Sequence, residues 1–590
     1  MFRIIKLLFF FLIFIPKLNA ENITESQEIS GVTRTAQQHI KDDADITFTI
    51  TNSTISRANY TIKINTTESA EANNATIVIS SDSTVKTTTG GNAIYGNGSD
   101  GLTVNNSGTV SSSESTKAID LANSTGATIT NNSGGSIYAN GRTISVGASD
   151  TATINNYGKI YSTTTGGQGN TIYSTDNTET LTLTNHAGGE ITNNSSSKST
   201  LRIRKTSTIT NSGTIKNNQG PSATAIELYG SNNTLTLKDS GIVVGIIESS
   251  GTNNTLKLQH GVGQSYFYET SGNFTLEDLD GNNVVKGSAG SVGQGGNEFI
   301  DESLGYKSLN IRKSLTQFKI SDQFLDRDTA WVETFSSLLK RDGKSSSLKL
   351  ENSLVNFGAN IIKPLENLNF VISAETSLQN ISKDHDVDRI SILSGFYFNN
   401  HQNNKKLKGE YFILGGIGLN KSERLILTNT TSSGLLNVTD NYENFEILFG
   451  NKLNNSFLIP DIGYTLGYSY TPSHKESKYF DWDDRHVLNI SAALSDEYTF
   501  FQTDKRNFSL GWILDYRTLA NNDDQNYLIN GTRTFYDQDN ELKKEASFSS
   551  NLNYKYKANE NSIFSFNLDG LTSSQDSVSL LANLIFKFKI

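Results

Sequence analysis

The sequence predicts an all-β chain, in which a right-handed parallel β-helix precedes a 12-stranded antiparallel transmembrane β-barrel with an α-helix in its lumen. Three observations predict this fold class. An Asn- and Gly-containing phrase recurs every 23–31 residues in the N-terminal half. The C-terminal half consists of alternating apolar–polar segments joined by alternately short and long loops. A segment with helical apolar spacing lies between the two halves.

The composition excludes several classes of protein. The 590 residues include no cysteine, which excludes disulfides, thiolate metal sites and a cysteine nucleophile. The formal net charge of −10 lacks the basic excess that nucleic-acid binding requires, so we expect no nucleic-acid partner. The mean hydropathy of −0.40 does not exclude a membrane barrel, because strands that alternate apolar and polar residues keep the average low.

The first twenty residues predict a secretory signal peptide. Arg3 and Lys6 form a positive start, Leu7–Ile15 is an unbroken apolar run, and Ala20 is a small residue at a plausible cleavage point. The alternative is an N-terminal anchor helix, but the apolar run is too short to cross a bilayer as a helix.

Residues 21–285 predict the β-helix. The phrase at Ile209–Ile215 (ITNSGTI) has four further copies. Their glycines align as Gly108, Gly135, Gly158, Gly189 and Gly213, at steps of 27, 23, 31 and 24 residues. A β-propeller is the alternative, but its four-stranded blades need about 40 residues per repeat. We expect the asparagines to form hydrogen-bonded ladders, the glycines to supply positive φ, and residues 265–285 to form a terminal cap.

Residues 286–297 (KGSAGSVGQGGN) predict a flexible linker, and residues 298–328 a lumenal helix. The helix prediction rests on a stripe with spacings of 7, 4, 3 and 7 residues: Leu304, Ile311, Leu315, Phe318 and Leu325. Tyr306–Leu325 would span about 30 Å, the thickness of the bilayer's hydrocarbon core. The alternative is an ordinary surface helix on a soluble domain.

Residues 329–590 predict the barrel. Twelve segments of about ten residues alternate apolar and polar side chains, as in Val578–Ile590. A soluble sandwich alternates in the same way. Short turns on one side and long loops on the other, at 420–440, 471–485 and 519–541, favour an outer-membrane barrel.

This order of segments resembles the monomeric autotransporters of Gram-negative bacteria (type V secretion) and covers essentially the whole chain. Ala330–Phe335 matches the usual first barrel strand of that family, and Ile585–Ile590 matches its alternating last strand. The resemblance implies an outer-membrane barrel that exports its own N-terminal passenger to the cell surface. It also implies three partners: the Sec translocon, the barrel assembly machinery and outer-membrane lipid.

The resemblance also assigns residue roles. The last strand is the family's assembly signal, carried here by Phe586, Phe588 and Ile590, although the family usually ends on Phe or Trp. Self-cleaving members have an Asn-Asn site in the helix, whereas this chain has Leu309-Asn310-Ile311. We therefore expect the passenger to remain attached.

The sequence predicts no catalytic, cofactor or metal site, and one binding stripe. The residue after each small-Ile strand forms a predicted column: Tyr95, Asp120, Ser145, Tyr173, Arg204 and Glu227. Asp120 and Glu227 would lie four coils apart, about 19 Å, too far for a glycosidase pair. The stripe suits surface glycans or like passengers; the alternative is a solvated strand face.

Three functions follow from these observations. The first is an autotransporter whose passenger is a non-catalytic adhesin or self-association module. The second is a secreted carbohydrate-active β-helix enzyme, which a carboxylate cluster on adjacent coils would favour. The third is a plain structural or porin-like outer-membrane barrel, against which the helix and the repeats argue.

Overall fold

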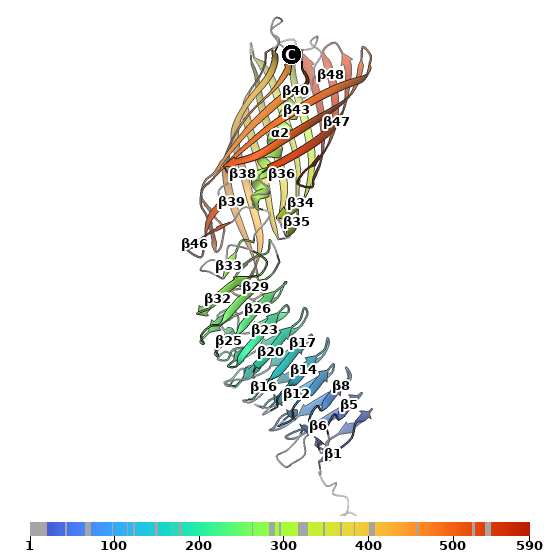
Figure 1. The fold of residues 1–590 in the computed structure, drawn as a ribbon, viewed down its shortest axis with the longest axis vertical. Coiled ribbons are helices and arrows are strands. Elements are labelled where there is room, and N and C mark those ends of the chain that lie inside the picture. Colours follow the sequence, from blue (N-terminus) through green and yellow to red (C-terminus); the bar gives the residue numbers. More distant parts are fainter. Residues whose placement is uncertain are drawn as a thin grey trace, which may run out of the picture. The chain divides into compact units, whose positions relative to one another are not determined.

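The computed structural model describes residues 20–589 apart from short gaps, of which the longest are 65–71, 282–288, 317–328, 401–406 and 537–543. Of the predicted signal peptide only Ala20 is described, and it is exposed. The chain forms two compact units, a parallel β-solenoid and an antiparallel β-barrel (Figure 1). No helix in the described part of the chain is long and apolar enough to cross a membrane.

The solenoid has three parallel sheets, to which successive coils contribute one strand each. The first sheet contains β1 (Glu21–Ile23), β4 (Gln38–Ile40), β7 (Ile62–Ile64), β10 (Ile94–Gly96), β13 (Ile119–Leu121), β16 (Ile144–Val146), β19 (Ile172–Ser174), β22 (Leu201–Ile203), β25 (Thr224–Leu228), β28 (Ile246–Ser249) and β31 (Thr270–Gly272). The second contains β2 (Gln27–Ser30), β5 (Thr47–Thr51), β8 (Thr76–Ile79), β11 (Thr103–Asn106), β14 (Ala127–Asn131), β17 (Ala152–Asn156), β20 (Thr180–Asn185), β23 (Thr206–Asn211), β26 (Thr234–Lys238), β29 (Thr255–Gln259) and β32 (Thr275–Asp278). The third contains β3 (Thr33–Arg34), β6 (Thr54–Arg57), β9 (Thr84–Thr87), β12 (Thr109–Ser112), β15 (Ser136–Ala139), β18 (Lys159–Ser162), β21 (Glu190–Asn193), β24 (Thr214–Asn217) and β27 (Ile242–Val244).

The solenoid core is a stack of identical apolar positions. Ile94, Ile119, Ile144 and Ile172 lie in register in neighbouring strands, and none of them is exposed to solvent. Each coil therefore buries its apolar side chains against the coil before and the coil after it, as in other solenoids. The predicted parallel β-helix is confirmed.

A ladder of buried asparagines runs along the second sheet. The amides of Asn106, Asn131, Asn156 and Asn185 each donate from Nδ2 to Oδ1 of the next asparagine, at 2.8, 2.9, 2.8 and 2.8 Å, and the last acceptor is Asn211. All five side chains are fully buried. The ladder is bounded in register by apolar residues, Ile79 before it and Leu237 after it. The expectation of asparagine ladders is confirmed.

The glycines of the repeat have a different role from the one predicted. None of the five aligned glycines has a φ in the left-handed region, so the expectation of positive φ is wrong at those positions. They are required because the coils approach closely. A Cβ at Gly158 would lie 2.3 Å from the carbonyl oxygen of Gly135, and a Cβ at Gly213 would lie 2.3 Å from that of Gly189. The positive φ belongs to the preceding turn residues, Gly134 and Gly188.

The end of the solenoid also differs from the prediction. In the segment expected to form a cap, β31 and β32 are regular coil strands, whereas β30 (Ser265–Phe267) pairs antiparallel with β33 (Gly290–Ser291). The segment expected to be a flexible linker therefore contains a strand.

The barrel has twelve antiparallel strands and is closed. They are β34 (Thr329–Ser345), β35 (Leu348–Leu365), β36 (Leu368–Ser382), β37 (His385–Asn400), β38 (Leu407–Thr428), β39 (Leu435–Asn455), β40 (Leu458–Thr471), β43 (Arg485–Gln502), β44 (Arg506–Asn521), β47 (Lys544–Asn559), β48 (Ser562–Ser573) and β49 (Ser577–Lys589). Pairing of β34 with β49 joins the first strand to the last. The strand number is as predicted, but the strands have 12–22 residues rather than about ten.

Alternation along the barrel strands separates two chemically different faces. In β49, Val578, Leu580 and Leu584 are 52–60% exposed on the outside, whereas Leu581 and Ile585 are buried inside. Polar side chains occupy most inward positions of the neighbouring strands. The outer surface is thus apolar and the lumen polar, which is the arrangement of a barrel in lipid.

Two of the predicted long loops are structured. The segments between β40 and β43 and between β44 and β47 contain β41 (His474–Lys475), β42 (Phe480–Trp482), β45 (Gln525–Ile529) and β46 (Thr532–Tyr536), which pair into a four-stranded sheet. The predicted loop at 420–440 is mostly strand, because β38 and β39 extend far beyond their neighbours and leave only residues 429–434 between them.

Replacement of Asn156 by Ala tests the ladder. The substitution removes the donor to Asn185 Oδ1 and the acceptor for Asn131 Nδ2, so we expect the solenoid to lose about 1–3 kcal/mol of stability. Urea unfolding of the full chain, followed by trypsin sensitivity of the solenoid, measures the loss. Asn218→Ala is the matched control, because the Asn218–Asn194 bond (2.7 Å) is exposed. Equal midpoints for both variants would contradict the prediction.

Candidate functional site: the occupied lumen and its mouth

The lumen of the barrel is filled by one helix, α2 (Asn297–Thr316) (Figure 1). Of the predicted stripe, Leu304, Ile311 and Leu315 are at most 4% exposed and pack in one cluster with apolar side chains of the barrel wall. Phe318 and Leu325 lie outside the described residues. The charged face of the helix is buried as deeply as the apolar one, so the alternative of a surface helix is wrong.

The C-terminal half of α2 carries three cations, each paired with a carboxylate of a different barrel strand. Lys307 pairs with Glu446 at 2.7 Å, Arg312 with Asp515 at 3.1 Å, and Lys313 with Asp569 at 2.6 Å. All six side chains are at most 5% exposed. Since breaking one buried pair leaves an uncompensated charge, these contacts fix how far the helix enters the lumen and how it is rotated.

The N-terminal half of α2 has the opposite charge. Asp301 pairs with Arg485 at the start of β43, and Glu302 pairs with Arg341 near the end of β34. Acidic residues in the first turns and basic residues in the last also complement the helix dipole. Reversal of the helix in the lumen would place like charges against like.

The closing seam of the barrel is tied to the same helix. Glu333 on β34 accepts hydrogen bonds from Asn360 on β35 (2.9 Å) and from Asn583 on β49 (2.8 Å). Ser314 of α2 donates to the same carboxylate. One buried side chain therefore connects the first strand, the last strand and the helix.

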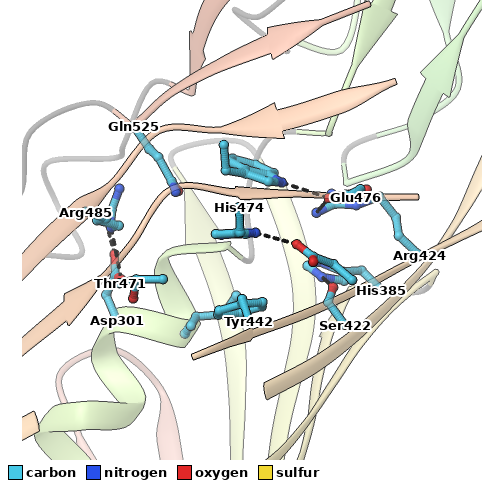
Figure 2. Close-up of a pocket in the computed structure, with 13 residues that line it drawn as sticks. Asp301, His385, Ser422, Arg424, Tyr442, Thr471, His474, Glu476, Arg485 and Gln525 are labelled. Atoms are coloured by element: carbon cyan, nitrogen blue, oxygen red, sulfur yellow. Dashed lines mark hydrogen bonds and ion pairs between the residues drawn. The ribbon is translucent and has the colours of Figure 1, made fainter. Parts of the chain in front are cut away.

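A small cavity of about 60 Å³ lies where α2 begins (Figure 2). Polar pairs from several elements surround it. Asp301 is bonded to Arg485, His474 to Asp440, and the indole of Trp482 donates to Glu476 at 2.9 Å. The His474 ring is stacked between Tyr442 (4.3 Å between centroids) and Trp482 (6.2 Å).

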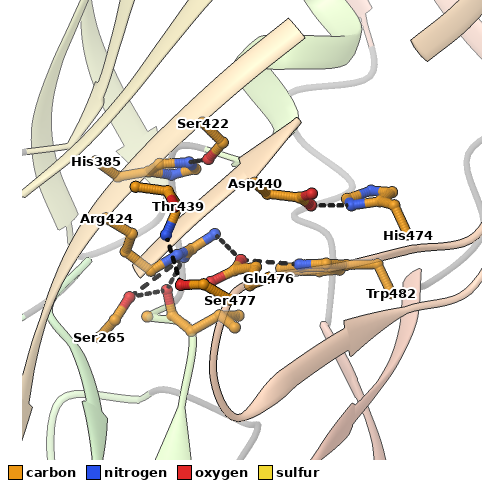
Figure 3. Close-up of polar contacts among 12 residues, drawn as sticks. Ser265, His385, Ser422, Arg424, Thr439, Asp440, His474, Glu476, Ser477 and Trp482 are labelled. Carbon is orange, nitrogen blue, oxygen red and sulfur yellow. Dashed lines mark hydrogen bonds and ion pairs between the residues drawn. The ribbon is translucent and has the colours of Figure 1, made fainter. Parts of the chain in front are cut away.

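The end of the barrel at which α2 begins, with its cavity, is called the mouth below. Arg424 connects the mouth to the segment that precedes the helix (Figure 3). Its guanidinium donates to the Val292 carbonyl oxygen at 2.8 Å and to Ser265 Oγ at 3.2 Å, and it pairs with Glu476 at 3.2 Å. Burial raises the pKa of the Glu476 carboxyl. The charge of Arg424 and the hydrogen bond from the Trp482 indole act in the opposite direction and lower this pKa. The chain that leaves the barrel is thus held at the mouth by an arginine on a barrel strand.

On the solenoid, the residues of the predicted binding stripe lie in one column, except for one residue. Tyr95, Asp120, Ser145 and Tyr173 lie in register on successive strands. The next position is Arg202, which pairs in register with both Tyr173 and Glu227, so Arg204 was wrongly placed in the column. Leu201, rather than Ile203, occupies the equivalent of Ile172. Asp120 and Glu227 are four coils apart, as expected.

Similarity of this chain to known proteins is found among solved structures only. No protein-family model matches it, and no curated protein sequence does. Among solved structures, the translocator domain of the autotransporter NalP from Neisseria meningitidis is similar with a TM-score of 0.35 and 10% identity, over 50% of this chain and 98% of that one. The transport unit of the autotransporter AIDA-I from Escherichia coli gives 0.30 and 7%, over 48% and 98%. The toluene transporter TbuX from Ralstonia pickettii gives 0.28 and 9%, over 45% and 91%.

The architecture itself is plain: the chain is a closed 12-stranded barrel that holds a helix in its lumen and carries a β-solenoid. This is the fold that the sequence predicted.

Sequence reasoning identified the helix but not its partners. Asp515 and Asp569 occupy polar positions of alternating strands. A carboxylate at such an inward position, in a barrel that holds a basic helix, could have indicated a partner for the helix. The mouth residues carried no such signal, because Asp301, Arg424 and Glu476 are far apart in sequence. Among the residues that the structure describes, no group of three or more His, Asp or Glu is arranged to hold a metal ion.

Substitution of Lys313 tests whether the ion pairs seat the helix. Lys313→Met leaves Asp569 buried and unpaired, so we expect a loss of about 3–5 kcal/mol from the seated helix and frequent open events in planar-bilayer conductance recordings of the full chain. The double variant K313M/D569L removes both charges and is expected to stay closed. Lys475→Ala, which breaks an exposed pair with Asp481, is the control. A Lys313→Met protein as closed as the parent would contradict the prediction.

Proposed function

We propose that this protein is an outer-membrane autotransporter, whose barrel anchors and exports its own N-terminal β-solenoid. The observation that carries the proposal is the direction of α2 in the lumen. Ser314 contacts Glu333 near the start of β34, whereas Glu302 contacts Arg341 near its end. The helix therefore runs antiparallel to β34, and the chain before it leaves the barrel at the end opposite the barrel's own termini.

The loops identify which side of the membrane that end faces. The two longest connections, 472–484 and 522–543, lie at the end where α2 begins. In outer-membrane barrels the long loops are extracellular and the short turns periplasmic. The solenoid, which precedes α2, is accordingly on the outside, and the barrel termini are in the periplasm. Secretion through the Sec translocon and insertion by the barrel assembly machinery belong to the same proposal.

The solenoid suits export through a narrow barrel. The lumen accommodates one helix, so the solenoid passes as an extended chain. Each coil buries its isoleucines against the coil already folded, so that folding proceeds coil by coil outside the barrel. Burial of apolar area at each step opposes return of the chain and favours outward movement without a nucleotide.

We further propose that the displayed solenoid is a non-catalytic adhesin or self-association module. The half-buried tyrosines and arginines of its first sheet, together with the exposed Tyr229 beside β25, support this role. The carboxylates considered for an enzyme are separate and engaged: Lys117 pairs with Asp120 at 2.8 Å, and Arg202 with Glu227 at 3.5 Å. A porin-like function is disfavoured by the helix that fills the lumen.

Protease shaving of intact cells tests the export proposal. We expect proteinase K to remove the solenoid, detected with an antibody to residues 21–280, and to leave a protected fragment of the barrel. The control is a sample with a permeabilised outer membrane, in which a periplasmic marker is also digested. A solenoid that stays intact until the outer membrane is opened would overturn the proposal.

A further inference from the structure

One face of the solenoid carries an unbroken column of threonines. The column lies on the outward side of the second sheet, from β5 to β32 (Figure 1), and each threonine is in register with the threonine of the next coil. Ten coils contribute one residue each: Thr47, Thr76, Thr103, Thr128, Thr153, Thr182, Thr208, Thr234, Thr255 and Thr275. Since adjacent strands are about 4.8 Å apart, the column is about 43 Å long.

A second column runs beside the first, two residues further along each strand. From β5 to β26 it contains no ionisable residue: Thr49, Val78, Asn105, Thr130, Asn155, Thr184, Thr210 and Thr236. Two residues of a strand advance about 6.7 Å. The two columns, called the threonine lattice below, are therefore an array with repeats of about 4.8 Å in one direction and about 6.7 Å in the other.

The other two sheets of the solenoid do not keep such an array. On the first sheet the outward column includes charged residues such as Asp120 and Arg202. On the third sheet a run of threonines ends at Thr109, and Ser136 and Lys159 follow it. Threonine favours strands in general, but that preference would act on all three sheets alike. The threonine lattice is thus a property of one face.

The hydroxyl groups of the threonine lattice are not used inside the protein. Within the described part of the chain, none of the hydroxyls of its fifteen threonines forms a hydrogen bond to a protein atom, and each of these threonines is exposed or half-buried. Threonines at inward positions behave differently, since the Thr143 hydroxyl donates to the carbonyl oxygen of Tyr161 at 2.7 Å. The hydroxyls of the lattice therefore remain available to an external partner.

A rigid array of this kind recognises a partner with the same period. Because threonine is β-branched, its χ1 angle is restricted, which fixes the positions of its hydroxyl and methyl groups. One hydroxyl contributes little net free energy, since it exchanges one hydrogen bond to water for another. The small contributions add up only where the groups of the partner recur at both spacings, and an array that is already ordered loses little entropy on binding.

We propose that the threonine lattice binds the surface of ice. Hexagonal ice repeats its water positions along its a and c axes at spacings close to the two repeats of the lattice. Its surface is uncharged, and the threonine lattice matches it in carrying no charge over eight successive coils. The inference names the kind of surface to which the proposed adhesin attaches, and it rests on the proposed display for a position outside the cell.

Two other occupants fit the lattice less well. A β-linked sugar chain advances further per residue than one coil, so it loses register along the column, and the lattice lacks the aromatic rings on which sugars stack. A second copy of the chain would need apolar area to bury, but Val78 is the only aliphatic residue in the two columns.

Binding is tested on the full chain in detergent micelles, so the assay does not depend on display. Ice is grown slowly from the solution, with a soluble dextran as the excluded reference, and we expect the parent protein to be enriched in the ice at least tenfold over the dextran. The variant T128Y/T153Y/T182Y places bulky rings in the middle of the column and is expected to lose at least fivefold in enrichment. The matched control T54Y/T84Y/T109Y makes the same change on the third sheet and is expected to lose less than twofold. Since tyrosine favours strands, both variants are expected to keep the urea midpoint of the parent.

A second variant separates the hydroxyl groups from the shape of the face. T128V/T153V/T182V keeps the size and branching of the side chains but removes three hydroxyls, so we expect a partial loss of enrichment. Exclusion of the parent protein from ice to the same extent as dextran would overturn the inference, as would equal losses in the lattice variant and the control. Binding to microcrystalline cellulose without enrichment in ice would also overturn it and would indicate a polysaccharide partner. Protease shaving reports separately on display, so either proposal can fail without the other.

Discussion

The pairing of the first barrel strand with the last is the constraint on which the rest of the barrel depends. Thr329–Arg341 pairs continuously with Ser577–Lys589, so no strand edge is left open. Within a bilayer an open edge would leave backbone groups without hydrogen-bond partners, at a cost of several kcal/mol each. Closure at twelve strands also sets the width of the lumen, and that width admits one helix. The helix supplies partners for several charges of the lumen lining, and other charges pair between neighbouring strands, as Arg517 does with Glu545.

The ion pairs of α2 are better regarded as determinants of position than of stability. Two desolvated charges in a pair recover little more than the cost of burying them, whereas a misplaced helix would leave several charges unpaired. Because α2 is acidic at its N-terminal end and basic at its C-terminal end, its charges are all paired in only one orientation and at one depth in the lumen. Glu333 extends this control to the seam, because the same carboxylate contacts the helix and both strands that close the barrel.

Much of this molecule could be predicted from its sequence, because both halves repeat a short period. The alternation of Ser509 to Arg517 defined the two faces of a barrel strand, and the Asn-Asn-Ser-Gly phrase defined the coils. Predictions failed where two neighbouring residues fitted the repeat period equally well. Leu201 and Ile203 both have apolar side chains on the same face, so only pairing with the neighbouring coil shows that Arg202 belongs to the column. The mouth was beyond prediction because Arg424, Glu476 and Val292 meet only through the closed barrel.

The asparagine ladder has a direction along the solenoid. Every amide donates toward the C-terminal coil, so each asparagine in place presents a free Oδ1 to the coil that precedes it in sequence. If the C-terminal coils emerge first, each arriving coil brings an amide donor to an acceptor that is already in place. The series ends at Asn106, whose Oδ1 has no partner among the described residues because Ile79 is next in register. Aligned amides polarise one another, so each further bond in the same direction strengthens the bonds already formed.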